Sequence, residues 1–243
     1  MVIARVDLAG TLNSRISNQY RDVFSFIENS KKVKALILIL NSGGGDAASS
    51  EILMESVNKI RKAKPVFAVI EGTGASGAYW IASASTKIYA MSTSVTGSIG
   101  VIGINPNVKE LLNKIGIRLD IIKMGEYKDM LNPFSEIDSV GREKYKEILE
   151  YSYAVFKNSV AQNSGLSAEE IETVATGEIF SPSRALELRL IDKIGTYDDA
   201  LNDMIKSYDL KRKMRVFSPR KTFLEKMVSS SLISTLMEWT LNI

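Results

Sequence analysis

The sequence predicts an α/β fold with a largely parallel sheet and a helical C-terminal part. Strand-like runs alternate with helical patterns through the first half of its 243 residues, as they do when strands and crossover helices build one sheet. One run, residues 35–40, is apolar throughout, which is typical of a strand buried on both faces. From residue 139 onward helical spacing takes over, and no internal repeat divides the chain.

The expected elements follow one another at short intervals. β-Branched and aliphatic runs predict strands at residues 2–8, 34–40, 65–70, 87–91, 100–104 and 118–123. The spacing of apolar residues between these runs predicts helices at about 17–29, 46–62, 77–83 and 108–115. After Pro133 the pattern predicts only helices, at 139–163, after the capping box from Ser167 to Glu170, after Ser181-Pro182 and around 198–207.

The chain contains no histidine and no cysteine. Catalysis by a Ser-His-Asp triad or by a Cys-His pair is therefore excluded. The same absence excludes disulfides, iron–sulfur clusters, and zinc or haem sites built on those ligands. A general base in this protein has to be Lys, Asp, Glu, Tyr or a terminal amine.

Basic charge is concentrated near the C-terminus. The formal net charge is +3, but residues 211–243 hold seven basic and two acidic residues, which leaves residues 1–210 with 24 basic and 26 acidic residues. We therefore divide the chain into a body, residues 1–208, and a basic tail, residues 209–243. The body shows no basic stripe interleaved with aromatic residues, so we expect no binding of nucleic acid.

The tail has the pattern of an amphipathic helix. Its apolar residues recur at near-helical spacing, at Leu224, Val228, Leu232, Leu236 and Trp239. Such a segment suits either an anionic membrane surface or packing against the body or a neighbouring subunit. No run in the chain approaches the ~18 consecutive apolar residues of a membrane span, and the first residues lack the pattern of a signal peptide.

Two glycine-rich turns lead from predicted strands into predicted helices. The first, residues 41–46, reads Asn-Ser-Gly-Gly-Gly-Asp; its backbone amides suit an anion, although a tight turn explains the glycines equally well. It matches neither the P-loop nor the GxGxxG pattern, so no nucleotide site is expected. The second, residues 72–80, places Ser76 at a strand-to-helix junction, either as a nucleophile or as a helix N-cap. Successive strand ends of a parallel sheet lie side by side, so Gly45 and Ser76 are expected to meet at one crevice.

Two further segments supply polar partners. Residues 96–100, Thr-Gly-Ser-Ile-Gly, hold Ser98 in a run of small residues that also suits a simple turn. Residues 125–129, Gly-Glu-Tyr-Lys-Asp, hold Lys128, which on its own would be a solvated surface lysine. Without histidine, however, a lysine is the only common activator left for a serine.

Together these segments resemble the signal peptide peptidase A (SppA) family, membrane-associated serine peptidases with a Ser-Lys dyad. The resemblance spans residues 2–208 and is carried by ordered motifs at 41–45, 75–84, 87–90, 96–101, 125–134 and 183–192. The family fold is of the Clp-protease and crotonase type, a spiral of ββα units. Two positions depart from the family pattern: Gly43 stands where Pro is usual, and Ala78 stands where a second Gly usually follows the nucleophile.

The resemblance implies a role for each motif residue. Ser76 would be the nucleophile, Lys128 the general base, and Ser98 the residue that orients the lysine amine. The amides of Gly45 and Gly77 would form the oxyanion hole. No cofactor or metal is implied. A lysine must lose its proton before it can act as a base, and burial in an apolar pocket favours that loss.

The resemblance also implies substrates and assembly. The activity would be that of a serine endopeptidase that cuts hydrophobic peptides, such as remnant signal peptides, in an apolar groove. A homo-oligomer is expected, in which Lys128 of one chain can reach Ser76 of a neighbour. Membrane association is implied as well, while the lack of a spanning segment leaves a soluble or cytoplasmic protein open.

Three other functions remain open at this point. A crotonase-like acyl-CoA enzyme would use the same glycine-built oxyanion hole but would not need Ser76 paired with Lys128. A non-catalytic scaffold of the Clp/crotonase fold would keep the architecture without the chemistry. A related peptidase would use the same dyad against one particular membrane or capsid protein.

Overall fold

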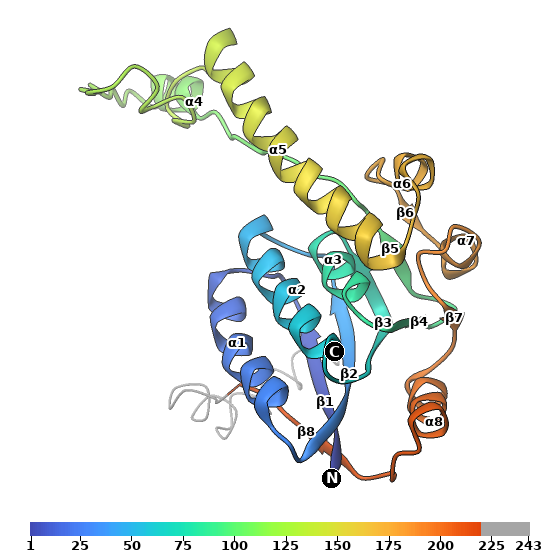
Figure 1. The fold of residues 1–243 in the computed structure, drawn as a ribbon. Helices are drawn as coiled ribbons and strands as arrows, with labels where there is room; N and C mark the ends of the chain where they lie inside the picture. Colours follow the sequence, from blue (N-terminus) through green and yellow to red (C-terminus); the bar gives the residue numbers. More distant parts are fainter. Residues whose placement is uncertain (220–243) are drawn as a thin grey trace, which may run out of the picture.

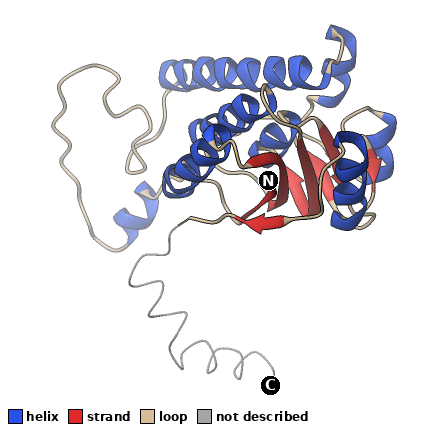
Figure 2. Cartoon of the chain, turned by 60° about the horizontal axis from the view of Figure 1, so that its bottom comes forward, coloured by secondary structure: helices blue, strands red, loops and turns tan. Residues whose placement is uncertain are grey.

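The computed structural model describes residues 1–219, and its body is a mostly parallel eight-stranded sheet with helices on both faces (Figures 1 and 2). The strands are β1 (Val2–Ala9), β2 (Val33–Ser42), β3 (Val66–Ala75), β4 (Lys87–Ala90), β5 (Val95–Gly97), β6 (Ile179–Phe180), β7 (Lys193–Ile194) and β8 (Met214–Val216). The helices are α1 (Ser14–Asn29), α2 (Ala47–Arg61), α3 (Gly77–Ser83), α4 (Lys109–Lys114), α5 (Ser139–Ser164), α6 (Ala168–Val174), α7 (Pro182–Glu187) and α8 (Tyr197–Tyr208). The sheet runs β6-β5-β3-β2-β1-β8, with β4 paired to β3 and β7 to β4. The β5–β6 pair is antiparallel.

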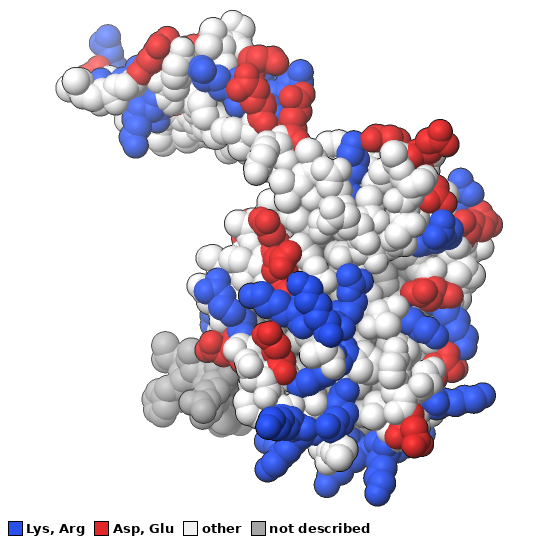
Figure 3. Space-filling model, in the orientation of Figure 1, with Lys and Arg blue, Asp and Glu red and all other residues white. Residues whose placement is uncertain are grey.

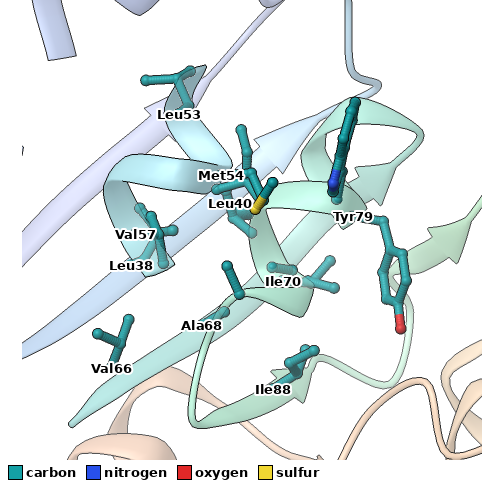
Figure 4. Packing of buried hydrophobic residues seen from close by; sticks show 14 of the residues in the cluster. Leu38, Leu40, Leu53, Met54, Val57, Val66, Ala68, Ile70, Tyr79 and Ile88 are labelled. Carbon is teal, nitrogen blue, oxygen red and sulfur yellow. The ribbon is translucent and has the colours of Figure 1, made fainter. Parts of the chain in front are cut away.

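Strand β2 lies at the centre of the core because its side chains are buried on both faces of the sheet. Leu38 and Leu40 belong to the cluster on one face, and Ile37 and Ile39 belong to the cluster on the other. Helix α2 packs on the first face, where Met54 lies beside Leu40 and Val57 beside Leu38 (Figure 4). Helix α8 covers the second face. The predicted α/β architecture is therefore confirmed. The uninterrupted apolar run at residues 35–40 reflects burial on both faces of the sheet, as predicted.

Most of the predicted elements are confirmed. The first four strands and the helices of the body appear within a few residues of their expected positions. The capping box opens α6 with both reciprocal hydrogen bonds between Ser167 and Glu170 in place, and Ser181 caps α7 with Pro182 in the first turn. Strands β5 to β8 were not predicted, because runs of two or three residues carry no detectable periodicity.

Parallel register brings the functional turns to one edge of the sheet. Leu36 pairs with Val66, and Ser42 pairs with Gly74 near the carboxyl ends of β2 and β3. The glycine loop, residues 43–45, follows the first strand directly, and Ser76 follows the second. Both turns therefore leave the sheet at the same carboxyl edge, as in other parallel α/β sheets.

Residues 101–138 and the first half of α5 project away from the body (Figures 1 and 2). The helix predicted at 108–115 appears here as α4. The strands predicted at 100–104 and 118–123 are wrong, because the projecting segment offers no neighbouring strand with which they could pair. Their apolar side chains are exposed instead: Ile102 is 80% exposed and Ile122 is 96% exposed.

The first residues of the predicted tail contribute to the sheet. Strand β8 pairs with β1, from Ile3 with Met214 to Arg5 with Val216. The apolar residues of the tail, from Leu224 to Trp239, lie outside the described residues. Among the helices of residues 1–219, none combines the length and the apolar character that a membrane crossing requires.

Candidate active site

Ser76 lies on a strained turn between β3 and α3. Its φ of +54° and ψ of −127° are values that a residue with a side chain adopts only at a cost, and such strain is concentrated at functional sites. Ser76 occupies the N-cap position of α3, yet its side chain makes no capping hydrogen bond. Ser76 is therefore the N-cap by position but not by hydrogen bonding, and the hydroxyl of this half-buried serine makes no hydrogen bond to residues 1–219.

The glycine loop packs directly against this turn. Gly44 has a φ of +92°, and a Cβ atom at this position would lie 2.7 Å from the Gly77 nitrogen and 2.9 Å from Ser76 Cβ. Only glycine permits so close an approach of the two backbones. Ser42 fixes the loop, because its Oγ donates to the Gly10 carbonyl (2.5 Å) and accepts from the Gly44 amide (3.1 Å).

Two backbone amides at this contact, those of Gly45 and Gly77, donate to no group among residues 1–219. Gly45 is held from both sides, since the Leu12 amide donates to the Gly44 carbonyl (2.9 Å) and the Asp46 amide donates to the Leu12 carbonyl (3.0 Å). Gly77 is the first residue of α3, where an amide has no acceptor within the helix. Rigid, unsatisfied amides beside a free serine hydroxyl are the parts of an oxyanion hole.

Ser98 is held beside Ser76 by the short strands β5 and β6. The Ser76 amide donates to the Gly97 carbonyl (2.8 Å), and the Ser98 amide donates to the Glu178 carbonyl (2.6 Å). The buried Thr96 hydroxyl donates to the backbone of β3 (2.8 Å), which ties β5 to the strand that carries Ser76. Ser98 also has a positive φ, +52°, so two strained serines lie next to each other.

These residues line one open pocket of about 600 Å³ at the carboxyl edge of the sheet: Ser76, Ser98, Gly45 and Gly77 are all part of it. Much of the remaining lining is apolar and comes from α3, α5 and the segment after Ser98, with Trp80, Val101, Ile102, Ile148, Leu149 and Phe156. Among the described lining residues, Asp46 alone carries a charge, and its carboxylate caps α2 by accepting from the Ser49 amide (2.8 Å).

Trp80 links the serine turn to the wall of the pocket. Its amide donates to the Ser76 carbonyl (3.0 Å), one turn into α3. Its indole stacks on Phe156 of α5 with ring centroids 4.7 Å apart, and its Nε1 donates to Ser159 Oγ (2.8 Å). Helix α5 is therefore fixed relative to Ser76, although its first half extends beyond the body.

Lys128 does not lie in this pocket. It is exposed in a turn of the projecting segment. The neighbouring Asp129 carboxylate pairs with Lys123 (2.5 Å), and that hydrogen bond lowers the pKa of Asp129. Lys128 makes no ion pair with any residue between 1 and 219. The structure thus brings Ser76, Ser98, Gly45 and Gly77 together and leaves Lys128 apart from them.

The segment around Lys128 exposes an extensive apolar surface. Side chains that are at least 40% exposed here are Ile102, Ile104, Leu111, Ile115, Ile117, Leu119, Ile121, Ile122, Met124, Tyr127 and Phe134. Soluble monomers rarely leave so many apolar side chains together in water, and such surfaces mark contacts with other proteins or with membranes. Lys128 therefore lies within an exposed apolar surface of the kind that makes such contacts.

Comparison with known proteins places these motifs in a family. The family model described as Peptidase family S49 matches residues 58–211, which contain Ser76, Ser98 and Lys128. The chain belongs to peptidase family S49. A second family model, Clp protease, matches residues 3–97, which hold β1 to β5 and the glycine loop. The predicted resemblance to SppA and the predicted Clp-protease-like fold are confirmed.

Several relatives of this S49 chain bear protease names. A protein named as a protease in Methanocaldococcus jannaschii is 34% identical over 76% of this chain and 60% of its own length. A protein named as signal peptide peptidase SppA in Enterococcus faecium is 34% identical over 76% of this chain and 54% of its own. Protease 4 of Haemophilus influenzae is 32% identical over 82% of this chain and 34% of its own. The chain thus matches between a third and three fifths of the length of these relatives.

The sequence analysis did not identify three residues whose hydrogen bonds hold the parts of the site in place. Ser42, Thr96 and Trp80 each hold one part of it through hydrogen bonds to residues distant in sequence. The sequence offers a signal for all three, since each lies in a motif already singled out. Nothing in the sequence pairs Trp80 with Ser159, because that contact depends on how α5 crosses the sheet.

Proposed function

We propose that this chain is a serine endopeptidase in which Ser76 attacks the peptide bond and Lys128 acts as the general base. The observation that carries the proposal is the free, strained Ser76 next to the unsatisfied amides of Gly45 and Gly77. Membership of peptidase family S49 supports the same reaction. With no histidine in the chain, a lysine takes the role that histidine fills in most serine peptidases.

The reaction uses the chain's own groups. A neutral Lys128 amine accepts the Ser76 proton while Ser76 Oγ bonds to the carbonyl carbon, and the carbonyl oxygen becomes an anion that the Gly45 and Gly77 amides stabilise. The lysine ammonium then gives its proton to the leaving amine as the C–N bond breaks. A water molecule, deprotonated by the same lysine, attacks the acyl-enzyme and releases Ser76. Ser98 orients the amine throughout.

The lysine comes from a neighbouring chain in this proposal. Within one chain Lys128 is exposed and lies outside the pocket, so nothing there removes its amine from water. A neighbour that covers the apolar surface of the projecting segment would bury the amine, favour its neutral form and place it beside the neighbour's own Ser76. A homo-oligomer thus explains both the exposed surface and the incomplete site.

Apolar peptides are the proposed substrates. The pocket beside Ser76 is walled by Trp80, Ile148 and Phe156, among others, which favours an apolar side chain near the bond to be cut. Remnant signal peptides, which contain an apolar stretch, have the required chemistry. Some relatives carry a signal peptide peptidase name, in agreement with this substrate class.

Cleavage of a peptide panel tests the proposal. We expect wild type to cut peptides with apolar residues next to the cleavage point at least about tenfold more efficiently than polar peptides of equal length, because one methylene in an apolar pocket already changes selectivity tenfold or more. Ser76→Ala should abolish cleavage, while Ser92→Ala, an exposed serine away from the pocket, should not change it. Absence of cleavage by the wild-type oligomer would favour a non-catalytic scaffold, and persistent cleavage by Ser76→Ala would exclude Ser76 as the nucleophile.

A further inference from the structure

The edge of the sheet opposite the pocket carries a concentration of lysines that the proposed peptidase reaction does not use. Six of them, which we call the basic end, are exposed: Lys31, Lys32, Lys34, Lys62, Lys211 and Lys213. Figure 3 shows basic side chains gathered at the lower end of the molecule, where the parallel strands begin, while acidic and basic residues are interspersed over much of the remaining visible surface.

Strand register brings these lysines together from three separate stretches of sequence. The Val2 amide donates to the Lys32 carbonyl (2.8 Å), and the Ile3 amide donates to the Lys213 carbonyl (2.8 Å). The Leu36 amide donates to the Pro65 carbonyl (3.0 Å), which aligns the loop that holds Lys62 with the start of β2. The basic end is thus a consequence of the parallel sheet, since every one of these loops precedes a strand.

The six lysines have no ionic partner among residues 1–219. Other basic residues nearby are occupied: Lys64 donates to carbonyls at the end of α1, Arg61 donates to Asn163, and Arg212 pairs with Asp198 (3.2 Å). Partial burial lowers the pKa of Lys64. The basic end therefore has charges beyond those that the fold itself uses.

Repulsion among these lysines destabilises the folded chain when it has no partner. Helices α1, α2 and α8 all end near this edge, and one cation at each helix end would complement the dipoles. The six lysines of the basic end exceed that number, and their like charges repel one another. Soluble surfaces ordinarily mix both signs of charge. A surface of this kind becomes favourable when it faces an anionic partner.

We propose that the basic end docks on an anionic lipid membrane surface. The arginines beside these lysines, Arg61 and Arg212, bond to Asn163 and Asp198, so the charges left for a partner are lysines. Lysine is a compact point charge that suits a diffuse anionic surface, whereas arginine is preferred for paired recognition of nucleic-acid phosphates. An open cleft of about 520 Å³ lies among them and is lined by Met1, Val2, Ile3 and Leu210 together with Lys34, Lys211 and Lys213, and Asp209 is the one acidic residue in this lining. Apolar groups fringed by lysines suit the boundary between headgroups and acyl chains.

This docking leaves the candidate active site free. The pocket lies at the carboxyl edge of the sheet and the basic end at the amino edge, so a membrane on one does not cover the other. The interaction rests on charge and not on the peptidase reaction. Its failure and the failure of the proposed function are therefore separate outcomes.

Vesicle binding by the full chain tests this inference. Wild type should bind vesicles of equal parts phosphatidylcholine and phosphatidylserine, bind phosphatidylcholine alone far more weakly, and dissociate as salt is raised. The variant Lys31→Gln, Lys34→Gln, Lys213→Gln should bind the anionic vesicles about a hundredfold more weakly, since each lysine near such a surface contributes about 1 kcal/mol. The basic residues of the tail beyond Lys213 are unchanged in this comparison.

A matched variant controls for net charge. The variant Lys109→Gln, Lys114→Gln, Lys146→Gln also removes three positive charges, but from the projecting segment and α5. It should bind the anionic vesicles within about threefold of wild type, because salt screens charges that lie more than a Debye length from the membrane. Equal loss in both variants, or no loss in the first, would overturn the proposal. Binding of a DNA duplex that exceeds vesicle binding and depends on the same three lysines would overturn it too, in favour of a nucleic-acid surface.

Discussion

Co-expressing Ser76→Ala chains with Lys128→Ala chains should restore peptidase activity that neither variant has alone. Each variant by itself should lose about 10⁴–10⁶-fold in kcat, because removal of either partner of a nucleophile–base unit disables the whole unit. In a mixed oligomer, a site that takes Ser76 from one chain and Lys128 from its neighbour is intact in about a quarter of cases if chains assemble at random. The expected recovery is therefore large against a negligible background.

The structural reason is the separation of Lys128 from the pocket. The lysine is exposed on the projecting segment, and the pocket that holds Ser76 does not include it. Lys114→Ala, which removes another exposed lysine of the same segment, is the matched control and should keep activity. Co-expressed variants that stay inactive while each assembles like wild type would show that the base and the nucleophile belong to the same chain.

Gly44→Ala should lower kcat/KM by about 10²–10³-fold, the usual effect of losing one oxyanion donor. The added methyl group would lie 2.7 Å from the Gly77 nitrogen, in a backbone conformation, φ +92°, that alanine rarely adopts. The loop must then move away from the serine turn, and the amides of Gly45 and Gly77 can no longer meet the same oxygen.

Gly43→Ala is the control for Gly44→Ala, because it shows whether any added methyl group in this loop lowers kcat/KM. A Cβ atom at Gly43 meets nothing within 4 Å, and its φ lies outside the positive region, so the same methyl group should be accommodated with a much smaller loss of activity. The change should also stabilise the protein by about 0.4–1 kcal/mol, since alanine has less backbone freedom to lose on folding. Thermal unfolding measures that gain. Equal activity of Gly44→Ala and wild type would exclude the oxyanion role of this loop.

Features set by short stretches of sequence could be predicted well. The apolar run of β2 shows its burial on both faces, and the capping box from Ser167 to Glu170 shows where α6 begins. The meeting of Gly45 with Ser76 was also predictable, because it follows from the topology of parallel strands alone. The absence of histidine left a lysine as the only common activator for a serine.

Features that depend on distant packing could not be predicted. The apolar runs at 100–104 and 118–123 have the pattern of strands, but their apolar residues are exposed on a segment that leaves the body. A sequence pattern shows that a residue is apolar. It does not show whether that residue is buried by its own chain or by a partner. The basic end was predicted only in part: Lys211 and Lys213 belong to the predicted basic tail, but only the sheet register brings them to Lys31, Lys32, Lys34 and Lys62.

The most direct test of the central claim is to map the serine that becomes acylated. The wild-type protein is treated with a fluorophosphonate, which bonds covalently to an activated serine hydroxyl, and the modified peptide is identified by mass spectrometry. We predict a single adduct on Ser76, absent from Ser76→Ala and strongly reduced in Lys128→Ala. An adduct on another serine, or peptide cleavage that continues while Ser76 stays unmodified, would contradict the account.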